Sequence, residues 1–329
     1  LVLVAQERRR PYERPPLSKD YLRGEAELES AYVHEAGFYE SRSIELRTGA
    51  RVPTIARRAR EVVLDDDERI GWDRLLIATG AEPRRLDLPG AELDGVTYLR
   101  SVEDSDRLRA TIAAGGRLVV VGAGWIGSEA AASARQGGME VTVLERLDVP
   151  LQNVLGPTLG ALYGDIHRDH GVELLTGATL EALEGDGRVE RVRLGDGRTI
   201  DCAAVLVGVG VAPRTALAQP AGLEVDNGVL VDGMLRAAPD IFAAAGPWFS
   251  ASAQCPTRTR RAEPGRLTVA PSPAAAPARA APRIPPARRP SPTAPPAAPP
   301  STASRATLPA PHGDAESPQP RSRRRRRTA

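Results

Sequence analysis

The stretch RLVVVGAGWIGSEAAASARQGGMEVTVLER, residues 117–146, decides the fold of this chain. In order, it predicts a buried strand over residues 118–121, a glycine turn, a helix over residues 125–136 and a second strand over residues 139–144. The β-branched run before the turn is typical of a parallel strand that is covered on both faces. The strand–helix–strand order therefore predicts an α/β fold with a parallel sheet.

Three glycines between the first strand and the helix have the G-x-G-x-x-G spacing: Gly122, Gly124 and Gly127. The first permits a tight turn, the second lets a pyrophosphate approach the backbone, and the third lets the helix lie close to the strand. Trp125 and Ile126 would open the helix, whose amides and dipole face the phosphates. The turn with its flanking strands and helix predicts a dinucleotide-binding site.

Glu145 stands at the end of the second strand, about 20 residues beyond the glycine turn, the spacing at which a carboxylate takes both ribose hydroxyls. A carboxylate at that position repels a 2′-phosphate, so we expect NADH to be preferred over NADPH. Arg146 follows directly and would weaken this preference.

The composition divides the chain into two parts. Residues 251–329 contain no Phe, Tyr or Trp and are dominated by Pro, Ala and Arg, which predicts disorder. Because this tail holds 15 Arg against 3 acids, the net charge of +2 conceals an acidic body of about −10 over residues 1–250. No signal peptide or transmembrane segment is recognisable, and we expect a cytoplasmic protein.

The two cysteines, Cys202 and Cys255, are far apart and form no C-x-x-C pair. Neighbouring residues therefore cannot supply a redox-active dithiol. The four histidines show no spacing typical of metal ligands, and we expect no metal site.

Six motifs follow one another along the chain: PYERPPLSKDYL (11–22), DRLLIATGAEPR (73–84), YLRSVEDS (98–105), VVGAGWIGSEAA (120–131), GVGVAP (208–213) and GLEVDNGVLVD (222–232). Together they resemble the FAD-dependent ferredoxin/rubredoxin (putidaredoxin) reductase family, which has the pyridine nucleotide-disulfide oxidoreductase fold. The resemblance implies two Rossmann-like domains. Residues 1–98 and 215–246 would form a partial FAD-binding domain, residues 99–214 an inserted NAD-binding domain, and residues 247–329 the disordered tail.

In that family, hydride passes from NADH to the flavin, and electrons leave singly to a ferredoxin- or rubredoxin-type partner. The resemblance implies that Lys19 lies near the isoalloxazine, where Glu129 meets it, and that both serve catalysis. It implies further FAD contacts from Glu7 (or, as the second choice, Gln6) at the adenosine ribose, from the backbone of Val52 at the adenine, and from Ala78, Thr79, Gly80 and Arg100. It also places Gly208 of the GVGVAP motif in the NAD site.

A fixed cation near the reacting flavin atoms would stabilise the negative charge that develops as hydride arrives. Lys19 is the single lysine of the chain, which suggests that Arg is not an acceptable replacement there. Plainer interpretations stay open: chance retention of one lysine, a helix-surface role for Glu129, and a surface salt bridge for Arg100.

The chain also departs from the family pattern. It starts after the strand–turn–helix that holds the FAD pyrophosphate, and Ala245-Gly246-Pro247 lacks the family's flavin-binding Asp. We therefore expect FAD to bind weakly, and we hypothesise that residues from about 247 onward are a frameshifted reading. Two other functions stay open: a catalytically inactive NADH-binding remnant, and nucleic-acid binding through RSRRRRR (321–327), although such a run is more often an incidental solvated charge.

Overall fold

The computed structural model describes residues 1–244. The predictions for the tail, namely its disorder, its frameshift origin and its arginine run, lie outside the described residues. None of the helices within residues 1–244 combines the length and apolarity that crossing a bilayer requires.

A five-stranded parallel sheet has more strands than any other sheet of the described residues. Its strands are β8 (Val96–Tyr98), β9 (Arg117–Val121), β10 (Glu140–Glu145), β11 (Glu173–Thr176) and β15 (Ala204–Val207), in the order β11-β10-β9-β15-β8. The chain runs outward from β9 to β11 in one direction and places β15 and β8 on the other side. The point where the strand order reverses lies at β9, where open α/β sheets bind ligands. The α/β prediction is confirmed.

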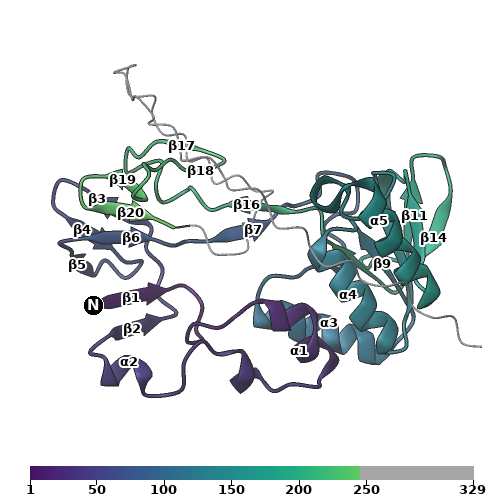
Figure 1. The fold of residues 1–329 in the computed structure, drawn as a ribbon, viewed down its shortest axis with the longest axis horizontal. Coiled ribbons are helices and arrows are strands. Elements are labelled where there is room, and N and C mark those ends of the chain that lie inside the picture. The colour runs from purple at the N-terminus through teal and green to yellow at the C-terminus, as the bar shows by residue number, and fades with distance from the viewer. Residues whose placement is uncertain (245–329) are drawn as a thin grey trace, which may run out of the picture. The chain divides into compact units, whose positions relative to one another are not determined.

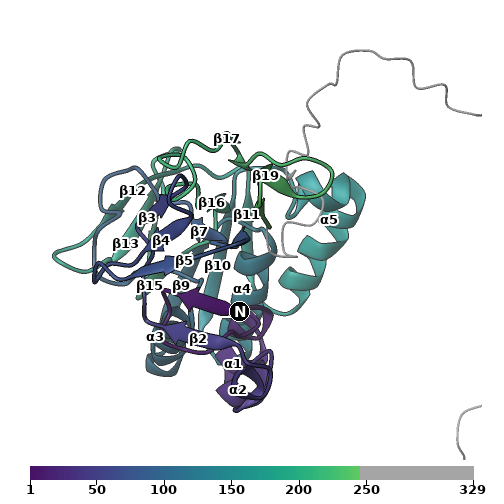
Figure 2. The ribbon, with the colours of Figure 1, turned by 90° about the vertical axis from the view of Figure 1, so that its left-hand side faces the viewer.

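Successive residues of β9 face opposite sides of this sheet. Leu118 and Val120 pack among α1 (Asp20–Arg23), α3 (Val102–Ala114) and α4 (Trp125–Gln136), whereas Val119 and Val121 pack against an antiparallel sheet of β12 (Leu180–Glu184), β13 (Arg191–Leu194) and β14 (Thr199–Asp201). Figure 2 shows α4 and α5 (Gln152–Asp169) on one side of the central strands and β12 and β13 on the other. Coverage of both faces explains why residues 118–121 of this strand are all apolar.

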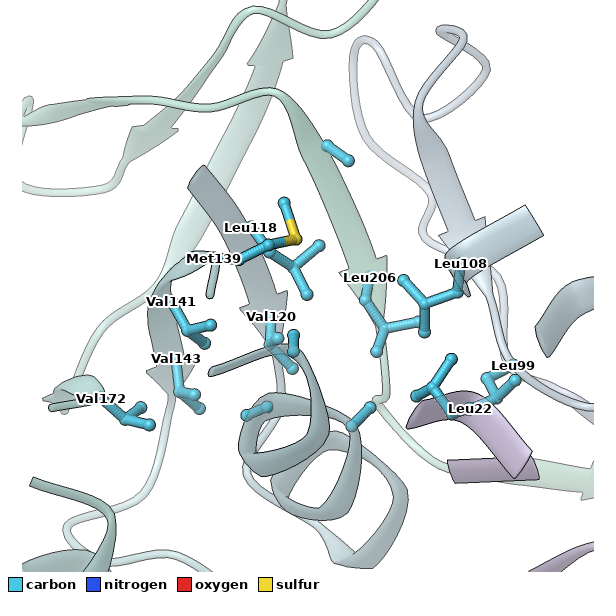
Figure 3. Close-up of a cluster of buried hydrophobic side chains, with 14 of the residues drawn as sticks. Leu22, Leu99, Leu108, Leu118, Val120, Met139, Val141, Val143, Val172 and Leu206 are labelled. Atoms are coloured by element: carbon cyan, nitrogen blue, oxygen red, sulfur yellow. The ribbon is translucent and has the colours of Figure 1, made fainter. Parts of the chain in front are cut away.

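A short N-terminal segment packs into the same core. The 3₁₀ turn η1 (Pro15–Ser18) and α1 lie beside α3 and α4 (Figure 1). Leu22 shares one buried cluster with Leu108, Leu118 and Leu206 (Figure 3). Residues assigned by sequence to the FAD-binding part therefore complete the core of the central sheet. Strand β8 also belongs to this sheet, although it precedes residue 99. The proposed domain boundaries stay a prediction.

The remaining described residues form small sheets, several of which surround a second core. Ile55, Val62, Ile77 and Ile241 are buried in it. Three of these sheets have two strands each: β1 (Val2–Ala5) with β2 (Glu45–Thr48), β7 (Ala81–Pro83) with β16 (Val211–Pro213), and β17 (Val225–Asp226) with β18 (Gly228–Val229). The other two have three strands each, in the orders β19 (Arg236–Ala238), β20 (Ile241–Ala243), β6 (Leu75–Ile77) and β3 (Thr54–Ala56), β4 (Glu61–Val63), β5 (Arg69–Gly71). Short turns of helix also occur at η2 (Leu28–Ala31) and α2 (Phe38–Ser41).

The apolar composition of residues 204–211 predicts a single buried strand, and this prediction is wrong. The strand of the central sheet ends at Val207, and the chain turns through Gly210, whose φ of 102° departs from an extended path. Val211–Pro213 then pairs antiparallel with β7 in a different sheet. Composition alone could not locate this break, because residues on both sides of it are equally apolar.

Candidate coenzyme and redox site

The glycine turn is built as its spacing predicts. Gly122 has φ 99°, and a Cβ on it would lie 2.6 Å from the carbonyl oxygen of Gly208. A Cβ on Gly127 would lie 2.0 Å from the carbonyl oxygen of Gly122, so the helix could not approach the strand as closely. A Cβ on Gly124, in contrast, would meet only the Gly208 oxygen at 3.9 Å. The described residues thus explain the first and third glycines, while the space beside the second is open to a diphosphate.

Glu145 ends β10 with its carboxylate held in one orientation. Its Oε2 accepts a hydrogen bond from the backbone N–H of Ala123 at 2.8 Å, and its Oε1 accepts one from Leu147 at 2.9 Å. Each oxygen retains a lone pair for a ribose hydroxyl. The carboxylate therefore braces the glycine turn, a role that the sequence analysis did not anticipate.

The other predicted NAD residues surround this turn. Gly208 donates its N–H to Val121 O at 2.8 Å, and a Cβ built on it would lie 3.4 Å from the Gly127 backbone. Ile126 packs on the core, whereas Trp125 leaves 42% of its surface exposed.

An aromatic side chain that the sequence analysis missed contacts Trp125. The rings of Trp125 and Tyr163, on α5, meet edge to face with centroids 6.5 Å apart, and Tyr163 also packs on His167 at 5.1 Å. Burial and the carboxylate of Glu129 raise the pKa of Tyr163. Burial and the neighbouring His170 lower the pKa of His167. No local pattern in the sequence signals this contact, because Trp125 and Tyr163 lie on different helices.

Lys19 and Glu129, 110 positions apart in sequence, meet in the structure. Lys19 Nζ lies 2.8 Å from Glu129 Oε1, and the hydroxyl of Ser18 donates to Glu129 Oε2 at 2.6 Å. The Lys19 side chain is 38% exposed and that of Glu129 19% exposed. A lysine charge is therefore fixed one helical turn from the glycine turn.

Arg100 is a half-buried cation among other cations. Burial, Arg14 and Arg214 together lower the pKa of Arg100 to about 10. Its Nη2 would lie 3.5 Å from a Cβ on Gly80, and within residues 1–244 no carboxylate forms an ion pair with it. Such a guanidinium favours the binding of an anion, because an anion would restore the stability of its charged form.

Glu7 lies close to this cation, but its carboxylate already has partners. Arg14 Nη2 donates to Glu7 Oε1 at 2.6 Å, and the hydroxyl of Tyr12 donates to Oε2. The structure thus places Glu7 beside Arg14 rather than with both oxygens free. Its role at the adenosine ribose stays a prediction, as does the alternative role of Gln6, which is exposed.

The predicted flavin turn Ala78-Thr79-Gly80 follows β6 directly. The Thr79 hydroxyl donates to the Arg214 carbonyl at 2.9 Å, and Gly80 has φ 68°. Val52 lies in the loop between β2 and β3 and packs on the second core. These positions are compatible with the predicted contacts, which no bound molecule tests.

Cys202 is half-buried, and burial raises the pKa of its thiol to about 11, so little reactive thiolate is present at neutral pH. Cys255 lies outside the described residues. Within the described part of the chain, no three His, Cys, Asp or Glu side chains gather as metal ligands.

Comparison with known proteins gives matches over the same region. The family profile "Pyridine nucleotide-disulphide oxidoreductase" matches residues 1–248. The probable ferredoxin reductase CtmF of Castellaniella defragrans is 44% identical over 74% of this chain and 60% of the relative, and the rhodocoxin reductase of Rhodococcus erythropolis is 40% identical over 75% and 58%. The reductase in a covalent putidaredoxin reductase–putidaredoxin complex superposes with a TM-score of 0.71 at 36% identity, covering 74% of this chain and 60% of that one. The chain thus spans about 60% of the length of these relatives.

Proposed function

Because the chain belongs to the pyridine nucleotide-disulphide oxidoreductase family, we propose that it is the NADH- and flavin-binding part of a ferredoxin/rubredoxin-type reductase. The observation that carries this proposal is the arrangement on α4. The helix begins at the glycine turn and presents Glu129, paired with Lys19, one turn later. A coenzyme site and a fixed cation are thereby joined by one rigid element.

Binding of NADH would depend on the turn and on Glu145. The open space beside Gly124 and the amides that begin α4 suit a diphosphate. The braced carboxylate of Glu145 would take the ribose hydroxyls and repel the 2′-phosphate of NADPH.

FAD is the proposed cofactor, and Arg100 and the turn at residues 78–80 fit it. Arg100 supplies a half-buried cation that forms no ion pair among the described residues, although the nearby Glu7 carboxylate raises its pKa, and such a cation suits an anionic cofactor. The small turn at 78–80 lets such a group approach the backbone. When bound, FAD supplies hydride acceptance from NADH and release of electrons one at a time.

Lys19 would hold its positive charge at the reacting end of the site. The carboxylate of Glu129 and the Ser18 hydroxyl keep the ammonium oriented, so no reorganisation is needed when negative charge develops nearby. The proposed partner is a ferredoxin- or rubredoxin-type electron acceptor, as the names of the relatives suggest for those proteins.

Stopped-flow mixing of the full chain with FAD and NADH tests the proposal. We expect the flavin absorbance to bleach, and Lys19→Gln to slow the bleaching by about 10²-fold, the order found when one oriented charge-stabilising donor is removed. Arg74→Gln, which changes an exposed cation that precedes β6, is the control.

Binding of NADH without any bleaching would contradict this proposal and support the alternative of an inactive NADH-binding remnant. If nucleic acid bound and the affinity were lost on deletion of residues 320–329, the arginine run would be its cause.

A further inference from the structure

The position of Lys19 beside Glu129 depends on the path of the main chain at residues 17–19. Hydrogen bonds from two buried hydroxyls fix that path. Ser133 on α4 donates from Oγ to the carbonyl oxygen of Ser18 at 2.7 Å. Ser105 on α3 donates to the carbonyl oxygen of Leu17 at 2.8 Å. Ser133 is 2% exposed and Ser105 is fully buried, so neither bond competes with water.

Ser133 and Glu129 lie one helical turn apart on the same face of α4, and both hold Ser18. Glu129 accepts from the Ser18 hydroxyl, while Ser133 donates to the Ser18 carbonyl. That carbonyl belongs to the planar peptide that joins Ser18 to Lys19. The Ser133 hydroxyl therefore orients the peptide from which Lys19 departs.

The geometry points to Ser133 as a positioning residue of the redox site: its hydroxyl keeps Lys19 in register with Glu129 across the contact between the N-terminal turn and α4 (Figure 1). The inference rests on the proposed function for the role of Lys19. The contact itself needs no coenzyme. Without this donor, the buried Ser18 carbonyl loses its partner, and the turn is free to move from α4.

The single lysine allows a direct test on the full chain. Reductive methylation with ¹³C-formaldehyde labels Lys19 and the terminal amine alone, and the methylated ammonium keeps its charge. The ¹³C-methyl resonance of Lys19 then reports its ion pair without flavin. Glu129→Gln provides the reference for a lost pair. We expect Ser133→Ala to move the resonance most of the way to that reference.

Ser128→Ala is the matched control. Ser128 is on the same helix and is also 2% exposed, and the described residues show no hydrogen bond from its hydroxyl to the N-terminal turn. We expect this variant to retain the wild-type resonance, and thermal unfolding checks that both variants fold. An unchanged resonance in Ser133→Ala, or an equal change in Ser128→Ala, would overturn the inference.

A kinetic measurement separates this inference from the proposed function. In Ser133→Ala we expect flavin reduction by NADH to slow roughly fivefold, as loss of about one hydrogen bond implies, with the Kd for NADH unchanged. If the wild-type chain reduces no flavin but the resonance moves as expected, the proposed function fails and the positioning role stands. If the wild type reduces flavin and Ser133→Ala equals it in both measurements, the positioning role fails.

Discussion

At the scale of single residues, the glycines of the coenzyme turn differ in what excludes a side chain. Gly124→Ala adds a methyl group where the chain leaves space, so we expect the melting temperature to be unchanged and NADH binding to be lost. Gly127→Ala forces a Cβ to within 2.0 Å of the Gly122 carbonyl, so we expect a lower melting temperature as well. Thermal unfolding and calorimetric NADH titration of both variants check this. Normal NADH binding by Gly124→Ala would contradict the assignment of the turn.

Glu145 sets the expected choice of coenzyme. Glu145→Gln removes the charge and turns an NH2 group toward one of the two backbone N–H groups that the carboxylate braces, so we expect a lower melting temperature as well as weaker NADH binding. We expect NADH affinity to fall roughly tenfold, the loss of about one charge-assisted hydrogen bond, and the ratio of NADH to NADPH affinity to approach unity. Competitive titration with both coenzymes measures the ratio. Glu140→Gln is the control, because Glu140 lies on the same strand and its ion pair with Arg117 is exposed to solvent. Equal effects in the two variants would show that Glu145 has no special role.

We expect Arg100 to have opposite effects on the stability of the fold and on FAD binding. Burial and neighbouring cations lower its pKa to about 10, so the fold disfavours the charged form. For a base with a depressed pKa, the unfolded chain binds more protons above that value, so the contribution of Arg100 to the stability of the fold becomes less unfavourable as pH rises past about 10. We expect Arg100→Gln to raise the melting temperature of the flavin-free chain at neutral pH and to weaken FAD binding.

Melting curves without flavin and FAD titration of the same variant provide the check. A lower melting temperature would mean that Arg100 has a stabilising partner, and unchanged FAD affinity would remove it from the flavin site.

At the scale of elements, the start of α3 shows how local sequence defines a helix. Ser101 accepts from the Asp104 N–H at 3.2 Å, and the Asp104 carboxylate accepts from the Ser101 N–H at 2.8 Å, which forms a capping box. We expect Ser101→Ala to lower the free energy of unfolding by about 1 kcal/mol. Urea unfolding measures this. In a double-mutant cycle with Asp104→Ala, the two losses should be less than additive, since each residue serves the other; strict additivity would argue against a reciprocal cap.

The local sequence pattern defines both ends of helix α4, whereas the helix packs on a segment that is distant in sequence, the N-terminal turn. Its bounds, Trp125–Gln136, agree with the prediction because the glycine turn and the following Gly137 mark both ends. The buried face that receives the N-terminal turn is made of small residues, which leave no periodic signal of their partner.

At the scale of the whole described chain, the proposed NAD site is built within one sheet. The coenzyme turn, α4 and Glu145 all belong to one sheet whose two faces are covered by the chain itself. We therefore expect flavin-free protein to bind one NADH. Calorimetry on flavin-stripped, folded material tests this; an absolute requirement for added FAD would contradict it.

The sequence by itself determined the parallel α/β sheet, the glycine turn, the bounds of α4 and the family, because these depend on spacing within short segments. Only the tertiary structure decided the end of β15 at Val207, the bonds from Ala123 and Leu147 that brace Glu145, and the cation cluster around Arg100. It also decided the hydrogen bond from the Ser133 hydroxyl to the Ser18 carbonyl. These features join residues far apart in the chain, and their partners are set by how surfaces pack in three dimensions, which the order of residues along one segment does not specify.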